Sequence, residues 1–272
     1  MDSWRIGDHL SATYAADDDC RDLMVGFVRR GVAAGHRVVV LLDTYSFELA
    51  RALTAAVPDA AIGQFTALRF GAGFGGPGAD GTPFGVADLV AGLTALYEQA
   101  LAAGYDALCV AGEMVWAQRA GFTAADLLAY EAQVNRSVGV GRAAALCAYD
   151  RRRFGADLLT RIGVLHPGPL LRFTLGGWGA HLRLSGELDA SNAGALPAIL
   201  SLVAGADSVV LLDASDLAFV DAAGAATIVR FAASRPARPT VVRCAGSVRQ
   251  VLRLVGADSV PSLVLRDQNS GV

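Results

Sequence analysis

Apolar runs and amphipathic segments alternate along the first half of the chain. Arg37–Leu42 (RVVVLL) is a short, continuous apolar run, which is typical of a strand buried on both faces of a sheet. Met24, Phe27 and Val28 recur at helical spacing after the acidic residues 17–19, which favour a helix start. The same pattern predicts strands at 6–14, 37–42, 62–70, 105–110 and 142–149, and helices at 17–31, 47–57, 86–103, 123–138 and 151–162.

Strands that alternate with helices in this way predict an α/β fold with a parallel sheet and right-handed crossovers. In such sheets, ligands bind beyond the carboxyl ends of the strands. Four side chains fall at or just beyond the predicted strand ends and are candidate ligand contacts: Asp43, Glu113, Trp116 and Asp150.

Each candidate also has a purely structural interpretation. Glu113 and Trp116 can hold a small polar or aromatic ligand, or they can bond the backbone and pack in the core. His9, in the first predicted strand, can contact a ligand or accept a proton, or it can be a satisfied core residue. Tyr149 and Asp150 can contact a ligand at a strand end, and Asp150 can instead cap the next helix. If the strand ends are neighbours, we expect His9, Glu113 and Trp116 to line one pocket.

In the second half of the chain, the segment 209–224 (VVLLDASDLAFVDAAG) is the most informative. An apolar run ends at Asp213, a turn is expected through Ser215 and Asp216, and a second apolar run leads to Asp221. Asp221 is well placed to cap the following helix, because its carboxylate can accept the free amide hydrogens of the first turn. This helix start is a natural position for an anion or a phosphate.

Composition narrows the function classes. The 272 residues suffice for two domains, and the net charge of −3 gives no basic surface for nucleic acid. The absence of lysine excludes a P-loop lysine and a Schiff-base lysine. The segment 71–85 is glycine-rich but lacks the P-loop order, so a surface loop is favoured over a phosphate cradle. With no catalytic triad or nucleophile motif in the sequence, we expect the chain not to be an enzyme.

The cysteines indicate whether a metal site is expected, and the apolar stretches indicate where in the cell the protein is expected. Cys20, Cys109, Cys147 and Cys244 are scattered and form no CxxC pair, so buried free thiols are expected, with no metal site and no particular cofactor. Acidic residues interrupt the N-terminal segment, so no signal peptide is expected. No apolar stretch is long enough to cross a bilayer, which predicts a cytoplasmic protein without membrane contact.

Spaced motifs in the first half resemble the MEDS domain, the sensory domain of the DcmR type, over residues 5–168. The motifs are His9 with Tyr14, Gly112-Glu-Met-x-Trp116, Tyr130-Glu-x-x-x-Asn135, Cys147-x-Tyr-Asp150 and His166-Pro167. The resemblance implies a RecA-like or KaiC-like sheet that has lost its nucleotide loop. It also implies a sensor of small organic molecules, whose ligand it does not identify.

Residues 169–268 resemble a STAS domain, the fold of anti-sigma factor antagonists. The matching segments are 184–189 (LSGELD), 209–224, a strand at 240–244 and a helix at 247–254. The resemblance implies that an anti-sigma factor, a serine kinase of the GHKL type, docks on this domain. It places five residues at the partner surface: Asp189, Asp213, Asp221, Ala222 and Gly224.

One position departs from that family pattern. Antagonists switched by phosphorylation carry Ser or Thr directly after the capping Asp, whereas this chain has Ala222 followed by Ala223. Without a hydroxyl, that position cannot receive the phosphate that would reorder a docked partner. We therefore expect an anti-sigma factor antagonist with a sensory domain and no phosphorylation switch at this site. The alternative is a small-molecule or nucleotide binding protein whose STAS half assembles a larger complex.

Overall fold

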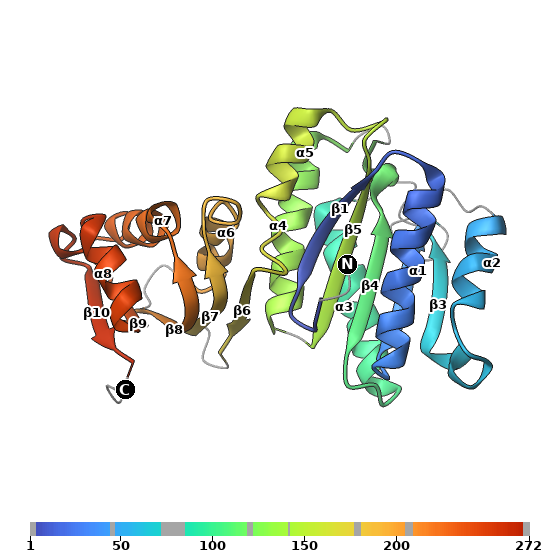
Figure 1. Cartoon of the computed structure of the whole chain (residues 1–272), viewed down its shortest axis with the longest axis horizontal. Coiled ribbons are helices and arrows are strands. Elements are labelled where there is room, and N and C mark those ends of the chain that lie inside the picture. The colour runs from blue at the N-terminus through green and yellow to red at the C-terminus, as the bar shows by residue number, and fades with distance from the viewer. Residues whose placement is uncertain are drawn as a thin grey trace. The chain divides into compact units, whose positions relative to one another are not determined.

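The computed structural model describes residues 4–43, 47–71, 85–118, 122–140, 142–176, 181–204 and 209–268. Residues 72–84 of the glycine-rich segment, and Thr44 after the second strand, lie outside the described residues. The chain divides into two compact units, Met1–Gly163 and Val164–Val272 (Figure 1). No helix among the described residues is long and apolar enough to span a membrane.

The first unit is built on a five-stranded sheet in which every strand pair is parallel, which confirms the expected α/β class. The strand order is β1-β5-β4-β2-β3. The strands are β1 (His9–Tyr14), β2 (Arg37–Leu42), β3 (Phe65–Arg69), β4 (Leu108–Glu113) and β5 (Ala143–Asp150). β3 begins later than the apolar pattern predicts, because Asp59–Gln64 forms the 3-10 helix η1.

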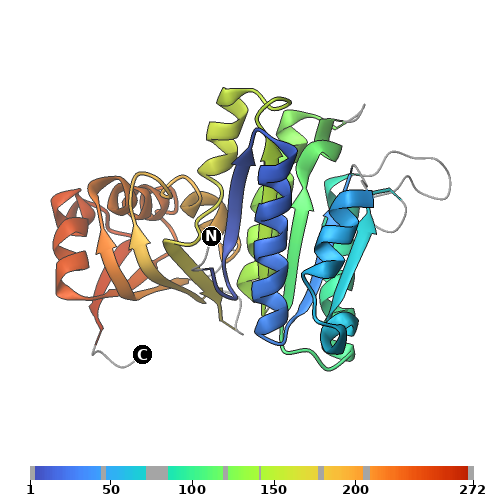
Figure 2. The same ribbon diagram turned by 45° about the vertical axis from the view of Figure 1, so that its right-hand side comes forward.

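Helices cover both faces of this sheet (Figure 2). They are α1 (Asp17–Ala33), α2 (Phe47–Ala55), α3 (Val86–Ala102), α4 (Ala124–Val140) and α5 (Ala156–Gly163), with the 3-10 helix η2 (Met114–Gln118) after β4. Successive strand residues face opposite sides, so Val38 and Val40 of β2 pack with α1 and α2, whereas Val39 and Leu41 pack with α3 and α4. The alternation therefore decides which face each strand-end side chain joins.

The connections diverge between β2 and β4. The chain leaves β2 through α2 toward β3 at one edge, and it leaves β4 through α4 toward β5 on the other side. The two helices lie on opposite faces of the sheet, so a crevice is expected at the carboxyl ends of these two strands.

The second unit is a mixed five-stranded sheet in the order β10-β9-β8-β7-β6, which fits the expected STAS α/β class. Only the β6–β7 pair is antiparallel. The strands are β6 (Leu171–Leu175), β7 (His181–Leu188), β8 (Val210–Val220), β9 (Thr240–Cys244) and β10 (Leu263–Asp267). The helices are α6 (Leu196–Ser201), α7 (Ala222–Ala233), α8 (Gly246–Leu254) and the 3-10 helix η3 (Ala257–Ser259).

The turn expected through Ser215 and Asp216 is wrong, because β8 is a single strand across both residues. The β7–β8 register shifts twice, so β8 carries extra residues opposite β7 as β-bulges. The side chains that resemble a turn in sequence are bonded in the strand: Asp216 pairs with Arg183 of β7, and Asp213 accepts the backbone N–H of Ser215 at 3.1 Å. Ser215 therefore lies in the first bulge, between the paired residues Asp213 and Asp216.

Candidate functional site

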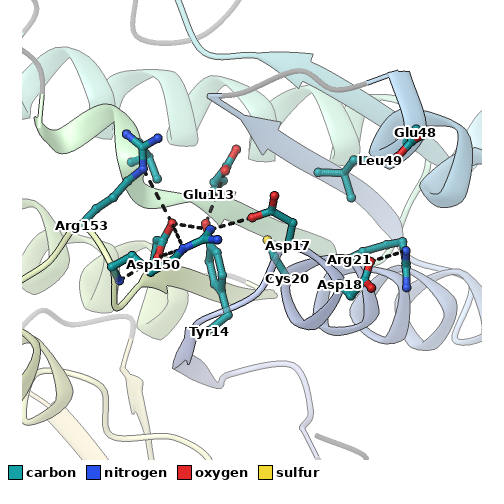
Figure 3. A pocket seen from close by; sticks show the side chains of 12 residues that line it. Tyr14, Asp17, Asp18, Cys20, Arg21, Glu48, Leu49, Glu113, Asp150 and Arg153 are labelled. Carbon is teal, nitrogen blue, oxygen red and sulfur yellow. Dashed lines mark hydrogen bonds and ion pairs between the residues drawn. The ribbon is translucent and has the colours of Figure 1, made fainter.

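A pocket of about 460 Å³ lies at the carboxyl edge of the first unit's sheet (Figure 3). Its walls come from the ends of β1, β4 and β5 and from the first turns of α1 and α2. All of the strand residues that line it face the side covered by α1 and α2. The pocket thus occupies the position at which an open parallel sheet binds ligands.

Glu113 ties three strand ends together at the base of this pocket. Its Oε2 accepts the backbone N–H of Asp43 at 3.2 Å, and its Oε1 accepts the Tyr14 hydroxyl at 3.4 Å. Burial, with the nearby Cys20 and Glu113, raises the pKa of Tyr14, so the phenol stays protonated and acts as a donor. Burial and the charge of Glu113 raise the pKa of Cys20 to about 12, which keeps that thiol neutral.

Asp150 is the second carboxylate of the strand ends, and arginine holds it. Its Oδ1 accepts both the backbone N–H and the Nε–H of Arg152 at 2.8 Å. The same guanidinium reaches Asp17 of α1 at 2.6 Å, so it bridges the two acids. Hydrogen bonds from Arg152 lower the pKa of Asp150 against the opposing effect of burial. Asp150 organises the turn after β5, where its carbonyl also accepts from Phe154, instead of capping α5.

Charge of both signs surrounds the cavity. Its lining includes five carboxylates and three guanidinium groups, in addition to the Tyr14 hydroxyl: Asp17, Asp18, Glu48, Glu113, Asp150, Arg21, Arg152 and Arg153. Hydrogen bonds in which one partner is charged are stronger than those between two neutral groups, and these side chains can offer such bonds to a ligand. A small polar molecule that carries both a basic and an acidic group, or several hydroxyls, suits this lining.

The structure does not bring His9, Glu113 and Trp116 into one pocket, so that expectation is wrong. Glu113 faces the α1/α2 side, whereas Trp116 belongs to the core under α3 and α4. His9 lies at the start of β1, opposite Ala145 of β5, far along the strand from the carboxyl edge. Tyr149 precedes Asp150 in the same strand and therefore faces the opposite side of the sheet.

Trp116 is a packed core residue that is 2% exposed. Its ring stacks on Phe70 with centroids 4.6 Å apart, and its edges meet Phe122 and Tyr130 at 5.0 and 5.4 Å. The cavity beside it holds only about 20 Å³, which is close to the space of a single water molecule. These contacts support packing in the core, and not ligand binding, as the role of Trp116.

His9 and Tyr149 belong to a buried polar network on the same face as Trp116. His9 Nδ1 lies 2.9 Å from Asn135 Oδ1, and His9 Nε2 lies 3.1 Å from Glu131 Oε2. The Tyr149 hydroxyl donates to Glu131 Oε1, and the Cys147 thiol lies 3.4 Å from Oε2. Burial raises the pKa of both Tyr149 and Cys147, and the charge of Glu131 adds to the effect.

Sequence reasoning missed several residues that the structure places at these sites. Tyr14, Asp17 and Arg152 line the pocket, and Glu131 and Asn135 complete the buried network. A signal was available for Tyr14, Glu131 and Asn135, since all three stand in the spaced motifs that resemble the MEDS domain. Nothing local in the sequence signals the Arg152–Asp17 contact, because it depends on β1 and β5 being neighbours.

In the second unit, Asp221 caps α7 as expected. Its Oδ1 accepts the backbone N–H of Gly224 at 2.8 Å, and its Oδ2 accepts the backbone N–H of Ala190 at 3.0 Å. The cap therefore fixes the start of α7 to the turn after β7. Ala222 and Ala223, the first two residues of α7, are exposed at this edge.

The other residues predicted at the partner surface shape the same region. Asp189 accepts the backbone N–H of Ser191 at 2.8 Å and holds the turn that Asp221 bonds. Gly224 lets α7 approach β7 closely, because a Cβ there would lie 2.6 Å from the Leu188 Cγ. Asp213 is only 7% exposed and pairs with Arg243 at 2.7 Å, so it acts inside the sheet and presents little surface to a partner.

Taken together, the geometry defines a protein of two α/β units, a parallel-sheet unit with a pocket at its carboxyl edge followed by a mixed-sheet unit with a capped, exposed helix start. The chain belongs to the family described as MEDS, the MEthanogen/methylotroph, DcmR Sensory domain, whose model matches residues 8–167. Residues 172–265 match a second model, described as Mlab, STAS domain. These matches confirm the MEDS–STAS order that the motifs predict. No curated protein matches the chain.

Proposed function

We propose that the protein is an anti-sigma factor antagonist whose affinity for its partner depends on a small polar molecule. The STAS unit binds a GHKL-type serine kinase that acts as the anti-sigma factor, and this binding releases a sigma factor. The MEDS unit binds the small molecule in the carboxyl-edge pocket.

The observation that carries the proposal is the start of α7. Asp221 holds this helix end in a capped, exposed conformation through bonds to Gly224 and Ala190. Ala222 and Ala223 are exposed and have no hydroxyl groups, so neither position can gain the charge of a phosphate. An antagonist of this kind stays competent to bind, and control passes from phosphorylation to the sensory unit. A sensory unit in the same chain would supply the control that the missing hydroxyl groups cannot.

Binding of the full chain to the GHKL-type kinases of its own host tests the proposal, with affinities measured by biolayer interferometry. Ala222→Asp adds charge and bulk at the helix start, and we expect it to weaken binding about tenfold or more. Ala237→Asp is the matched control, since it adds the same charge at an exposed residue after the other end of α7. If no kinase binds, or if both variants bind equally, the proposal is wrong.

The second candidate function is a small-molecule binding protein whose STAS unit joins a larger assembly. The missing hydroxyls at α7 also favour this function, because an assembly module needs no phosphorylation switch. Affinity purification from the host distinguishes the two. Recovery of a GHKL kinase supports the antagonist, whereas recovery of a stable multi-subunit complex without such a kinase supports the assembly module.

A further inference from the structure

A second chemical site lies in the core of the first unit and shares no residue with the carboxyl-edge pocket. His9 Nε2 and Glu131 Oε2 are 3.1 Å apart. The Cys147 sulfur lies 3.6 Å from that nitrogen and 3.4 Å from that oxygen. His9 and Glu131 are fully buried, and Cys147 is 5% exposed. An imidazole nitrogen, a carboxylate oxygen and a sulfur therefore meet at one point on the face covered by α3 and α4.

Two neighbours determine which atoms face this point. Asn135 Oδ1 lies 2.9 Å from His9 Nδ1, and because an amide oxygen only accepts, Nδ1 carries the hydrogen. In the neutral ring, Nε2 then directs its lone pair at Glu131 and Cys147. The Tyr149 hydroxyl donates to Glu131 Oε1, which leaves Oε2 as the oxygen that faces the imidazole. Histidine and carboxylate ligands of metal ions are oriented by outer hydrogen bonds of this kind.

Three electron-rich atoms held this close repel one another unless hydrogens or a metal ion lie between them. The bonds of zinc to nitrogen, oxygen and sulfur are about 2.0–2.3 Å, so in a tetrahedral site these ligand atoms lie about 3.3–3.6 Å apart. The two separations that involve the Cys147 sulfur, 3.4 and 3.6 Å, lie in this range, and the His9–Glu131 separation of 3.1 Å is slightly shorter. The geometry accordingly places these three residues in a group able to hold a metal ion.

We propose that His9, Glu131 and Cys147 bind a divalent transition metal ion of the zinc type. The three ligands come from β1, α4 and β5, so the ion would join elements that are distant in sequence. A metal bound only by the folded chain adds its binding free energy to folding. The metal-free alternative is an imidazolium–carboxylate pair beside a neutral thiol, which carries the desolvation cost of two buried charges.

Metal analysis of the full chain tests this proposal. The protein is produced in medium supplemented with zinc sulfate. The amount of zinc per chain is measured by inductively coupled plasma mass spectrometry. We expect about one zinc per chain in the wild type. Cys147→Ala and Glu131→Gln should lose most of it, while Cys109→Ala, which removes a buried thiol from the opposite face of the sheet, should retain it. Equal zinc in wild type and Cys147→Ala overturns the proposal.

A second measurement uses the wild-type chain, so it tests the proposal even if the Cys147 and Glu131 variants do not fold. The wild-type chain is unfolded, stripped of metal with a chelator and refolded with cobalt(II) chloride. Binding through Cys147 should give a thiolate-to-cobalt absorption band. The Cys109→Ala variant is the control, and after the same treatment it should show the same band. Refolding to the same melting temperature with and without cobalt, with no such band, overturns the proposal and assigns the contacts to the proton-linked pair.

Discussion

Glu113 and Asp43 meet across the carboxyl ends of β4 and β2, where the Glu113 Oε2 accepts the backbone N–H of Asp43 at 3.2 Å. These are the two strands at which the chain connections diverge. One carboxylate thus closes the crevice at its base while it lines the pocket above. The same side chain therefore bonds the strand ends at which the connections diverge and lines the pocket.

Glu113→Gln should weaken ligand binding while leaving the fold intact. The amide keeps the size of the side chain and an acceptor for Asp43 N–H, but it loses the charge that would bind a cationic or hydroxylated ligand. A set of amino acids, amines and hydroxy acids is first screened for compounds that raise the melting temperature of the wild type. For those compounds we expect affinity to fall about tenfold or more.

Glu98→Gln is the control for this variant, because Glu98 is exposed on α3 and undergoes the same change of charge. Its ligand-induced shift should equal that of the wild type. A full shift in Glu113→Gln would remove Glu113 from the binding site.

Trp116→Ala should lower stability without a specific loss of ligand binding. The indole is stacked on Phe70 and meets two further rings, so its removal leaves a large cavity in the core. Changes of this kind cost about 3–5 kcal/mol of the free energy of unfolding. Chemical denaturation measures this cost, and thermal shift with a compound that binds the wild type measures binding. A stable variant that no longer responds to the compound would contradict the core assignment.

Gly224→Ala should destabilise the second unit. A Cβ at this position would lie 2.6 Å from the Leu188 Cγ and 3.0 Å from the Leu188 carbonyl oxygen, so α7 and β7 would have to separate. Overpacking of this kind costs about 1–3 kcal/mol. Gly246→Ala is the control, since its Cβ meets nothing within 4 Å at the start of α8. Denaturation midpoints that agree for the two variants would show that α7 adjusts freely.

The Asp213–Arg243 pair should contribute stability that depends on pH. Burial raises the pKa of Asp213, but hydrogen bonds from Arg243 and Ser215 outweigh it, so the pKa in the folded state is lowered. The unfolded carboxyl has a pKa of about 3.9, so the stabilisation is complete above that pH. It is lost as the pH falls through the lower folded-state value, because protonation removes the charge that Arg243 holds.

Asp213→Asn tests this pH dependence by urea denaturation of both proteins between neutral and acidic pH. The wild type should be more stable than the variant at neutral pH, and the difference should shrink as the solution becomes acidic. A difference that stays constant over this range would mean that Asp213 stabilises the sheet without its charge.

The fold was predictable because its signals are local. Arg37–Leu42 is apolar throughout and forms the buried strand β2, and Asp221 caps α7 as its position before an apolar helix predicts. The full length of β8 was not predictable, since Ser215 and Asp216 resemble turn residues. They lie in a strand because bulges against β7 absorb the extra residues, and a bulge depends on a partner that local sequence does not identify.

The candidate site was predictable in part. Strand ends mark Glu113 and Asp150 correctly as pocket residues, but position along a strand does not determine the face. Alternation puts Tyr149 on the opposite face of the sheet from Asp150, and His9 lies on β1 at the end away from the carboxyl edge. Arg152 and Asp17 meet only because β1 pairs with β5, a long-range pairing that no local pattern contains.

The methyl groups of Ala222 and Ala223 also determine how long a signal can last. A phosphate on a hydroxyl persists after the kinase has left and requires a phosphatase for its removal. The start of α7 has no group that can store such a covalent mark. Any message passed through this helix end lasts only as long as the contact that causes it, so its lifetime is set by dissociation rates. If the proposed function holds, the response at this position follows present conditions and stores no covalent trace of earlier ones.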